Sequence, residues 1–211
     1  ILSLATACVD DAAFGPYLGK ATGETALLRE MLDSFCEGDV LVADRYYCSF
    51  MMIALLMQRG VDACVRMHQR RHVDFHKGRR LGKYDHLIEW QRPAKPGWMD
   101  DQTYATISET ITLRETRFQV TENGQRTETL TVVTTLLDPN ESSAEEIANL
   151  YGFRWNVELD ILQIKQTLNL DHMRCKTPAM VRKELWMTLL GYNLIRGVIC
   201  NAAMTHDKLP R

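Results

Sequence analysis

Two short apolar runs on either side of a helix-like stretch constrain the fold of this chain more than any other feature. Val40–Ala43 is continuously apolar, and Val61–Val65 is a second, mainly apolar run. Residues 49–59 between them have helical apolar spacing, and Gly60 can end that helix. A strand, a helix and a strand in this order predict an α/β fold, with Asp44 at the carboxyl end of the first strand.

Elements of both kinds continue on each side of this unit. Ile1–Cys8 and Thr129–Leu137 have the composition of strands. Ser143 and Glu146 have the spacing of a capping box, which predicts the start of a helix. The helices expected outside the central unit are residues 26–32, a segment that begins after residue 143, and residues 178–203.

Residues 67–128 lack helical periodicity. The segment is polar, contains Pro93 and Pro96, and has alternating Thr-rich stretches at residues 106–112. Short antiparallel strands are expected here, as an insertion into the α/β core. The predicted domains are therefore residues 1–66 as the first part of the core, 67–128 as a β-rich insertion, and 129–211 as the second part of the core.

The size and charge of the chain limit its possible functions. With 211 residues it can form one substantial core, or one core with a smaller inserted unit. The formal net charge of −2 gives no overall sign of nucleic-acid binding, so such a function has to depend on local charge. No apolar run approaches the roughly 20 residues that span a bilayer, so a membrane protein is not expected.

The six cysteines are scattered and include no Cys-x2-Cys pair. Without a secretory signal, this spacing predicts reduced, mostly buried thiols and a cytoplasmic protein. The chain begins with Ile1, inside an apolar run, which we interpret as a fragment that starts within a folded domain.

A four-residue pattern near the C-terminal end is typical of a binding site. Tyr151, Arg154, Glu158 and Lys165 fall within an arc of roughly 60° on one face of an ideal helix. An apolar stripe lies beside that arc, which predicts that the four residues stay out of the core. The stripe consists of Leu150, Phe153, Val157, Ile161, Ile164 and Leu168. A carboxylate flanked by two cations and a phenol can present a metal ion to a phosphate backbone.

Asp44 and Glu158 are the carboxylate pair most suited to hold that metal. Divalent cations such as Mg2+ take oxygen ligands, and two such ions can activate an attacking oxygen and stabilise a leaving oxygen in phosphoryl transfer. Aspartates at strand ends also form turns and cap helices, so the position of Asp44 does not by itself distinguish the two roles.

Three segments resemble the insertion-sequence transposases that have a DDE catalytic triad. Tyr151, Arg154, Glu158 and Lys165 match the YREK signature of that family. Residues 38–45 (Gly-Asp-Val-Leu-Val-Ala-Asp-Arg) are similar to its second-aspartate block, and residues 151–158 are similar to its glutamate block. Residues 190–196 (Leu-Gly-Tyr-Asn-Leu-Ile-Arg) are similar to the helix that follows.

The resemblance implies a ribonuclease-H-like mixed sheet with flanking helices and an inserted, mainly antiparallel β subdomain. Asp44 and Glu158 would bind Mg2+ or Mn2+ together with a further aspartate on a first, central strand. That strand is expected before Ile1, and Asp10 and Asp11 more closely match a turn. The family also implies that Tyr151, Arg154 and Lys165 contact DNA phosphates, and Arg45 is assigned to the same group.

A cationic stretch with interleaved aromatic residues lies between the two catalytic blocks, within residues 66–95. It offers phosphate contacts and base stacking, although a solvated charged loop has the same composition. The candidate DNA contacts are Arg70, Arg71, Arg79, Arg80, Lys83, Trp90 and Trp98. His68, His72 and His76 have the spacing of zinc ligands on a helix, but neighbouring Arg70 and Arg71 argue against a cation site.

These observations together predict the catalytic domain of a DDE transposase. Such an enzyme cuts double-stranded DNA at transposon ends and joins the freed 3′-hydroxyl to target DNA. A related metal-dependent nuclease is one alternative, and a catalytically dead relic or DNA-binding regulatory fragment is another. The expected setting is the bacterial cytoplasm, with a homo-oligomer assembled on paired DNA ends.

Overall fold

The computed structural model describes residues 1–16, 19, 22–120, 128–167 and 173–210. The chain divides into two compact units, each of which is described by itself. We call Leu18–Gly152 the sheet unit, and Ile1–Tyr17 together with Phe153–Arg211 the helical unit. The predicted division into three domains is a different partition and stays a prediction.

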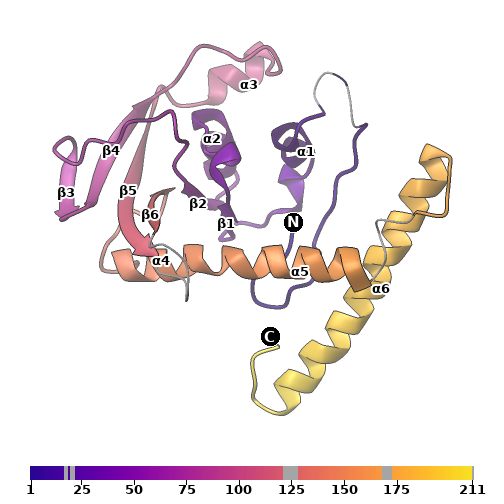
Figure 1. Ribbon diagram of the computed structural model, residues 1–211. Coiled ribbons are helices and arrows are strands. Elements are labelled where there is room, and N and C mark those ends of the chain that lie inside the picture. The colour runs from indigo at the N-terminus through magenta and orange to yellow at the C-terminus, as the bar shows by residue number, and fades with distance from the viewer. Residues whose placement is uncertain (17–18, 20–21, 121–127, 168–172, 211) are drawn as a thin grey trace. The chain divides into compact units, whose positions relative to one another are not determined.

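The sheet unit contains a mixed six-stranded sheet with the order β1-β2-β6-β5-β4-β3 (Figure 1). β1 and β2 are parallel, and all other neighbouring pairs are antiparallel. The mixed α/β sheet expected from the sequence is therefore confirmed. The strands are β1 Val40–Ala43, β2 Asp62–Arg66, β3 Arg79–Gly82, β4 Asp85–Gln91, β5 Thr110–Val120 and β6 Glu128–Thr134.

The predicted strand–helix–strand unit forms as expected. Helix α2, Phe50–Met57, connects β1 to β2, and the Ser49 side chain caps it by accepting from the Met52 amide at 3.2 Å. Gly60 then reverses the chain with a φ of 68°, where a side chain would be strained. Among the described strands, β1 and β3 are the two edge strands of the sheet.

Helices cover both faces of the sheet. α2 packs with Ala63 and Val65 of β2, whereas Ile147 of helix α4, Ala144–Gly152, packs with Cys64 between them. Successive residues of a strand point to opposite faces, so α2 and α4 lie on opposite sides. Helix α1, Glu24–Glu30, adds Leu28 to the core on the α2 side.

The described part of residues 67–128 contains the antiparallel strands β3, β4 and β5, as its composition suggested. β5 pairs with β6 over seven residues, so these strands continue the same sheet as β1 and β2. One expectation is wrong: the stretch around Thr106 belongs to helix α3, Asp101–Thr106, rather than to a strand. Asp100 caps that helix by accepting from the Thr103 amide at 2.8 Å and its hydroxyl at 2.7 Å.

The expected strand at Ile1–Cys8 is also wrong. The segment turns back on itself through a single antiparallel bridge between Leu2 and Val9, with Ala7 at a φ of 58°. It docks on helix α6, Pro178–Thr205, which begins after Thr177 as predicted. We call residues 1–10 the N-terminal turn; its backbone groups bond to α6 side chains instead of to a sheet.

The helix that was expected to carry the four-residue pattern begins with the predicted capping box. The Ser143 amide and hydroxyl each donate to Glu146 at 2.8 Å. The helix is interrupted at Phe153, so that α4 ends at Gly152 and helix α5, Arg154–Thr167, starts anew. None of the helices in the described part of the chain has the length and apolar character that crossing a membrane requires.

The cysteines are free thiols, but the expectation that most are buried is wrong. Cys48 and Cys64 are buried, Cys36 is exposed, and the other three are partly exposed. Burial raises the pKa of Cys48 to about 11 and that of Cys64 to about 12.

Candidate active site and nucleic-acid interface

Asp44 stands where β1 ends and a single 3-10 turn, Arg45–Tyr47, begins. Its Oδ1 atom accepts from the Arg45 amide at 2.7 Å, so the carboxylate caps this turn. The role as a cap and a role as a metal ligand are compatible, because a carboxylate has two oxygens and about four lone-pair directions.

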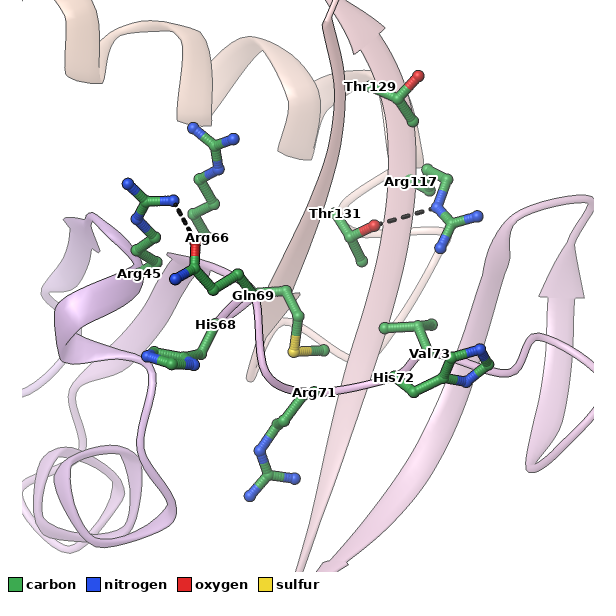
Figure 2. A pocket seen from close by; sticks show the side chains of 11 residues that line it. Arg45, Arg66, His68, Gln69, Arg71, His72, Val73, Arg117, Thr129 and Thr131 are labelled. Carbon is green, nitrogen blue, oxygen red and sulfur yellow. Dashed lines mark hydrogen bonds between the residues drawn. The ribbon is translucent and has the colours of Figure 1, made fainter.

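A cationic cavity of about 290 Å³ lies beside the carboxyl ends of β1 and β2. Ala43 pairs with Val65 in parallel register, so the residues that follow both strands emerge at the same edge of the sheet. Four arginines and two histidines line the cavity, and Figure 2 shows their side chains. They are Arg45, Arg66, Arg71, Arg117, His68 and His72.

Side-chain contacts hold three of these arginines in place. The Arg45 Nη1 atom donates to Gln69 Oε1 at 3.0 Å, and the Arg117 Nε atom donates to Thr131 Oγ1 at 3.1 Å (Figure 2). Arg66 forms an ion pair with Glu128. Guanidinium groups are always charged and offer paired donors, so the cavity is suited to an anion with several oxygens, such as a phosphate.

The structure corrects the expectation for Tyr151. It was predicted to face outward with Arg154, Glu158 and Lys165, but its side chain is only 4% exposed. Its ring packs in the core of the sheet unit, 6.5 Å from that of Phe118. Because the helix is interrupted at Phe153, the four residues do not share one continuous helix face.

The three remaining pattern residues lie on α5 in the helical unit. Arg154 Nη1 contacts Glu158 Oε1 at 2.6 Å, one helical turn apart, and the Glu158 side chain is 45% exposed. Lys165 is exposed. Arg154 and Glu158 therefore stabilise each other's charge on an accessible surface.

The apolar stripe predicted beside the pattern is buried only in part. Ile164 is buried, and Leu150 and Val157 are half-buried. Phe153 and Ile161 are exposed, contrary to the expectation. The sixth member, Leu168, lies outside the described residues.

Asp44 belongs to the sheet unit and Glu158 to the helical unit, so their pairing at one metal stays a prediction. No group of three or more His, Cys, Asp or Glu side chains suited to a metal ion occurs in the described part of the chain. His68, His72 and His76 lie in turns and extended backbone rather than on a helix, so they lack the spacing of helical ligands.

The cationic stretch presents its charges in two ways. Arg70, Arg79 and Arg80 are exposed, whereas other cations lie over aromatic rings. Lys83 stands 5.3 Å from the ring centre of Tyr84, and Arg29 covers the half-exposed Trp98 at 4.0 Å. Such cation–ring contacts hold the charged groups at the surface.

Trp90 is the member of this set that the structure buries. It is 5% exposed, its indole N–H donates to Glu115 Oε1 at 3.0 Å, and the Arg71 guanidinium covers its ring at 3.5 Å. The expectation that Trp90 is open for base stacking is therefore wrong in this structure.

Sequence reasoning missed the charged groups buried between β4 and β5. Arg114 forms two bonds to Asp85, at 2.8 and 2.6 Å, and a third to the Ser142 carbonyl at 2.5 Å. The residues that follow these two in the sequence also meet: His86 Nε2 lies 2.9 Å from Glu115 Oε2. The signal in the sequence was the adjacent charged pair Arg114 and Glu115 in the middle of a β-rich segment. Adjacent residues of a strand face opposite sides of a sheet, and a buried charge needs a partner, so the pair implies charged or polar partners on both faces.

Comparisons with known proteins identify the family to which the chain is similar. The family described as "Transposase DDE domain" matches residues 19–194. The transposase InsG of insertion sequence element IS4 from Escherichia coli is 28% identical over 192 residues, which is 88% of this chain and 40% of that protein. The transposase of insertion sequence element IS421, also from E. coli, is 37% identical over 65 residues, or 31% of this chain and 18% of that protein.

The chain thus spans about two fifths of the length of InsG. The family match covers most of the sheet unit and reaches into α6, so it includes Asp44, the cationic cavity and α5. With the mixed sheet and the cationic edge described above, this match shows that the chain belongs to the family of transposase DDE domains.

Proposed function

We propose that this chain is part of the catalytic domain of an insertion-sequence transposase. The protein would cut double-stranded DNA at transposon ends and join the freed 3′-hydroxyl to target DNA. Water would attack the phosphodiester first, and the 3′-hydroxyl would attack the target strand second. The observation that supports this most is the cationic cavity at the strand edge that carries Asp44.

The cavity fits the backbone of DNA rather than a small neutral ligand. Its guanidinium groups come from two strands, a 3-10 turn and a loop, and Arg45 directly follows the proposed metal ligand Asp44. A phosphodiester bound by Arg45, Arg66 and Arg117 would lie close to that carboxylate. The cations would position the scissile strand and partly neutralise its charge.

Asp44 and Glu158 are proposed to hold Mg2+ or Mn2+ together with a further carboxylate. Their oxygen donors match the preference of these hard cations, and Glu158 is accessible at the surface of α5. The metal, when bound, would supply activation of the attacking oxygen and stabilisation of the leaving oxygen. Arg154, which contacts Glu158 at 2.6 Å, is proposed to contact phosphate together with Lys165.

Tyr151, although buried in the core of the sheet unit, is proposed to contact a DNA phosphate. Its ring anchors the last turn of α4, one residue before the chain leaves the sheet unit. Its proposed contact with a DNA phosphate requires the hydroxyl group to reach the surface.

A strand-cleavage assay on the complete protein tests the proposal. Glu158→Gln should abolish detectable cleavage of transposon-end DNA, because it removes an anionic metal ligand, while end binding is largely kept. Glu145→Gln is the matched control, since Glu145 is an exposed acid in the first turn of α4. Cleavage by the Glu158 variant at the rate of the control would remove Glu158 from the mechanism.

A further inference from the structure

The loop that forms one side of the cationic cavity has open space behind it. Residues 68–78 connect β2 to β3, and His68, Arg71 and His72 line the cavity. A second cavity of about 370 Å³ lies on the other side, lined by Arg71, His72, Lys77, Trp90 and Glu115 among others. Because Arg71 and His72 border both spaces, this part of the loop is a wall between two cavities, whereas Val73 beside it packs against the hydrophobic core.

Two specific contacts fix the ends of this wall to the sheet. At one end the Arg71 guanidinium stacks on the ring of Trp90 at 3.5 Å. At the other end His86 Nδ1 lies 2.7 Å from the Lys77 carbonyl oxygen, and a carbonyl can only accept, so this nitrogen carries a proton. Phe75 packs between them, with its ring centre 4.8 Å from that of His86.

Both contacts depend on one buried carboxylate. Glu115 is 5% exposed; its Oε1 accepts from the Trp90 indole, and its Oε2 lies 2.9 Å from His86 Nε2. His86 Nδ1 already donates its proton to the Lys77 carbonyl. The contact between His86 Nε2 and Glu115 Oε2 is therefore attractive only if a second proton lies between these two atoms. Glu115 therefore sets the orientation of the indole under Arg71 and of the imidazole under Lys77.

We propose that Glu115 is a positioning residue for DNA binding: it holds the 68–78 loop in the place that completes the cationic cavity. The proposal rests on the assignment of that cavity to DNA phosphates. The hydrogen bonds of the Glu115 carboxylate go to Trp90 and His86, which are neither arginines of the cavity nor proposed metal ligands, so it acts through these two residues. Its own negative charge would by itself weaken DNA binding, so its contribution has to be geometric.

The charge of Glu115 and its positioning role predict opposite changes in DNA affinity when Glu115 is removed. Removing an acid from a DNA-binding protein raises its affinity through charge, whereas releasing the loop lowers it. The binding of a generic 20-base-pair duplex is measured across a salt series. Glu115→Ala should bind about tenfold more weakly, with a salt slope reduced by about one phosphate contact. Glu109→Ala, the matched control, removes an acid that is 89% exposed and should bind as well as or better than wild type.

The conservative variant separates positioning from charge. In Glu115→Gln the amide oxygen can accept from Trp90 and the amide N–H can donate to His86, so the affinity should stay within about twofold of wild type. Trp90→Phe keeps the ring under Arg71 but removes the N–H, and should lower affinity about threefold. Equal binding by wild type, Glu115→Ala and Trp90→Phe would overturn the proposal.

Hydrogen exchange tests the loop without DNA. The amides of Arg71 and Lys77 donate within the loop, to His68 at 2.9 Å and to Asp74 at 3.1 Å. In Glu115→Ala they should exchange about tenfold faster while the amide of Val132 in β6 is unchanged. Unchanged loop exchange would reject the positioning role even if DNA binds elsewhere. Faster exchange in a protein whose wild type does not bind duplex DNA would keep the role and reject the proposed function.

Discussion

The sheet unit and the helical unit are stabilised by different kinds of contact. Nearly all of the buried apolar side chains in the described residues belong to the sheet unit; Ala7, Ile164 and Tyr192 are those of the helical unit. The helical unit instead exposes a series of large apolar residues on α6, namely Trp186, Met187, Leu190, Leu194, Ile195 and Val198. A change of the same chemical type should therefore have a very different cost in the two units.

Polar contacts to backbone atoms take the place of a core in the helical unit. The Tyr192 hydroxyl donates to the Ala7 carbonyl at 2.9 Å, and Arg196 donates twice to the Thr6 carbonyl, at 2.9 and 2.7 Å. Asn193 bonds both backbone groups of Val9, at 2.9 and 2.7 Å. Such contacts are directional and local, whereas apolar burial is shared among many neighbours.

The largest effect is expected at the buried ion pair of the sheet unit. Asp85→Leu should lower the free energy of unfolding by about 4 kcal/mol, because it leaves Arg114 buried without its counter-charge. Urea unfolding followed by circular dichroism measures this loss. Asp101→Leu is the surface control: Asp101 is 93% exposed in its pair with Lys95, and the change should cost under about 1 kcal/mol. Similar losses in both variants would contradict the role given to burial.

Two leucines compare the units directly. Leu56→Ala removes a fully buried side chain of α2 and should cost about 3 kcal/mol of unfolding free energy. Leu194→Ala removes a side chain of α6 that is 65% exposed and should cost under about 0.5 kcal/mol. A large loss in the Leu194 variant would mean that the α6 face is covered in solution.

A smaller and local effect is expected at the N-terminal turn. Asn193→Ala removes both bonds to Val9 and should weaken the docking of the turn by about 1 kcal/mol. Hydrogen exchange at the Val9 amide should become faster, while amides of the sheet unit keep their rates. Faster unfolding of the whole chain is not expected, and a global loss of protection would show that the turn belongs to the main cooperative unit.

The smallest effect concerns pH and the start of α4. Hydrogen bonds from the Ser143 amide and hydroxyl lower the pKa of Glu146 below its usual 4.5. A carboxyl group with a depressed pKa stabilises the fold above its unfolded pKa and loses this contribution as the pH falls through the folded pKa. The amides of the first turn of α4 should therefore lose protection below about pH 4.5. Ser143→Ala should remove this pH dependence; its persistence would assign the effect to another group.

Several elements were predictable because their signals are local. Val40–Ala43 is apolar throughout and is bounded by charged residues, and Ser49 and Gly60 mark the ends of α2. The capping box at Ser143 and the proline after Thr177 likewise mark the start of a helix. Each of these strand and helix boundaries is determined by residues close to it in the sequence.

The features that were missed depend on distant partners. Asp85 and Arg114 are 29 residues apart and meet only through strand pairing, so no local pattern announces their bond. Ile1–Cys8 has the composition of a strand, but its backbone finds its partners on α6 instead of in a sheet. Tyr151 fits an outward-facing helix position until the interruption at Phe153 places it in a different unit from Arg154.

The way in which α6 holds the N-terminal turn has a consequence for sequence variation. Its polar side chains contact carbonyl and amide groups that every residue possesses, so the contacts do not depend on which side chains stand at positions 6 and 9. Position 9 should therefore vary more freely than Tyr192, Asn193 and Arg196, whereas the Thr6 hydroxyl also accepts from the Cys8 amide at 3.2 Å. Position 7, with its left-handed backbone, should favour glycine over any branched residue.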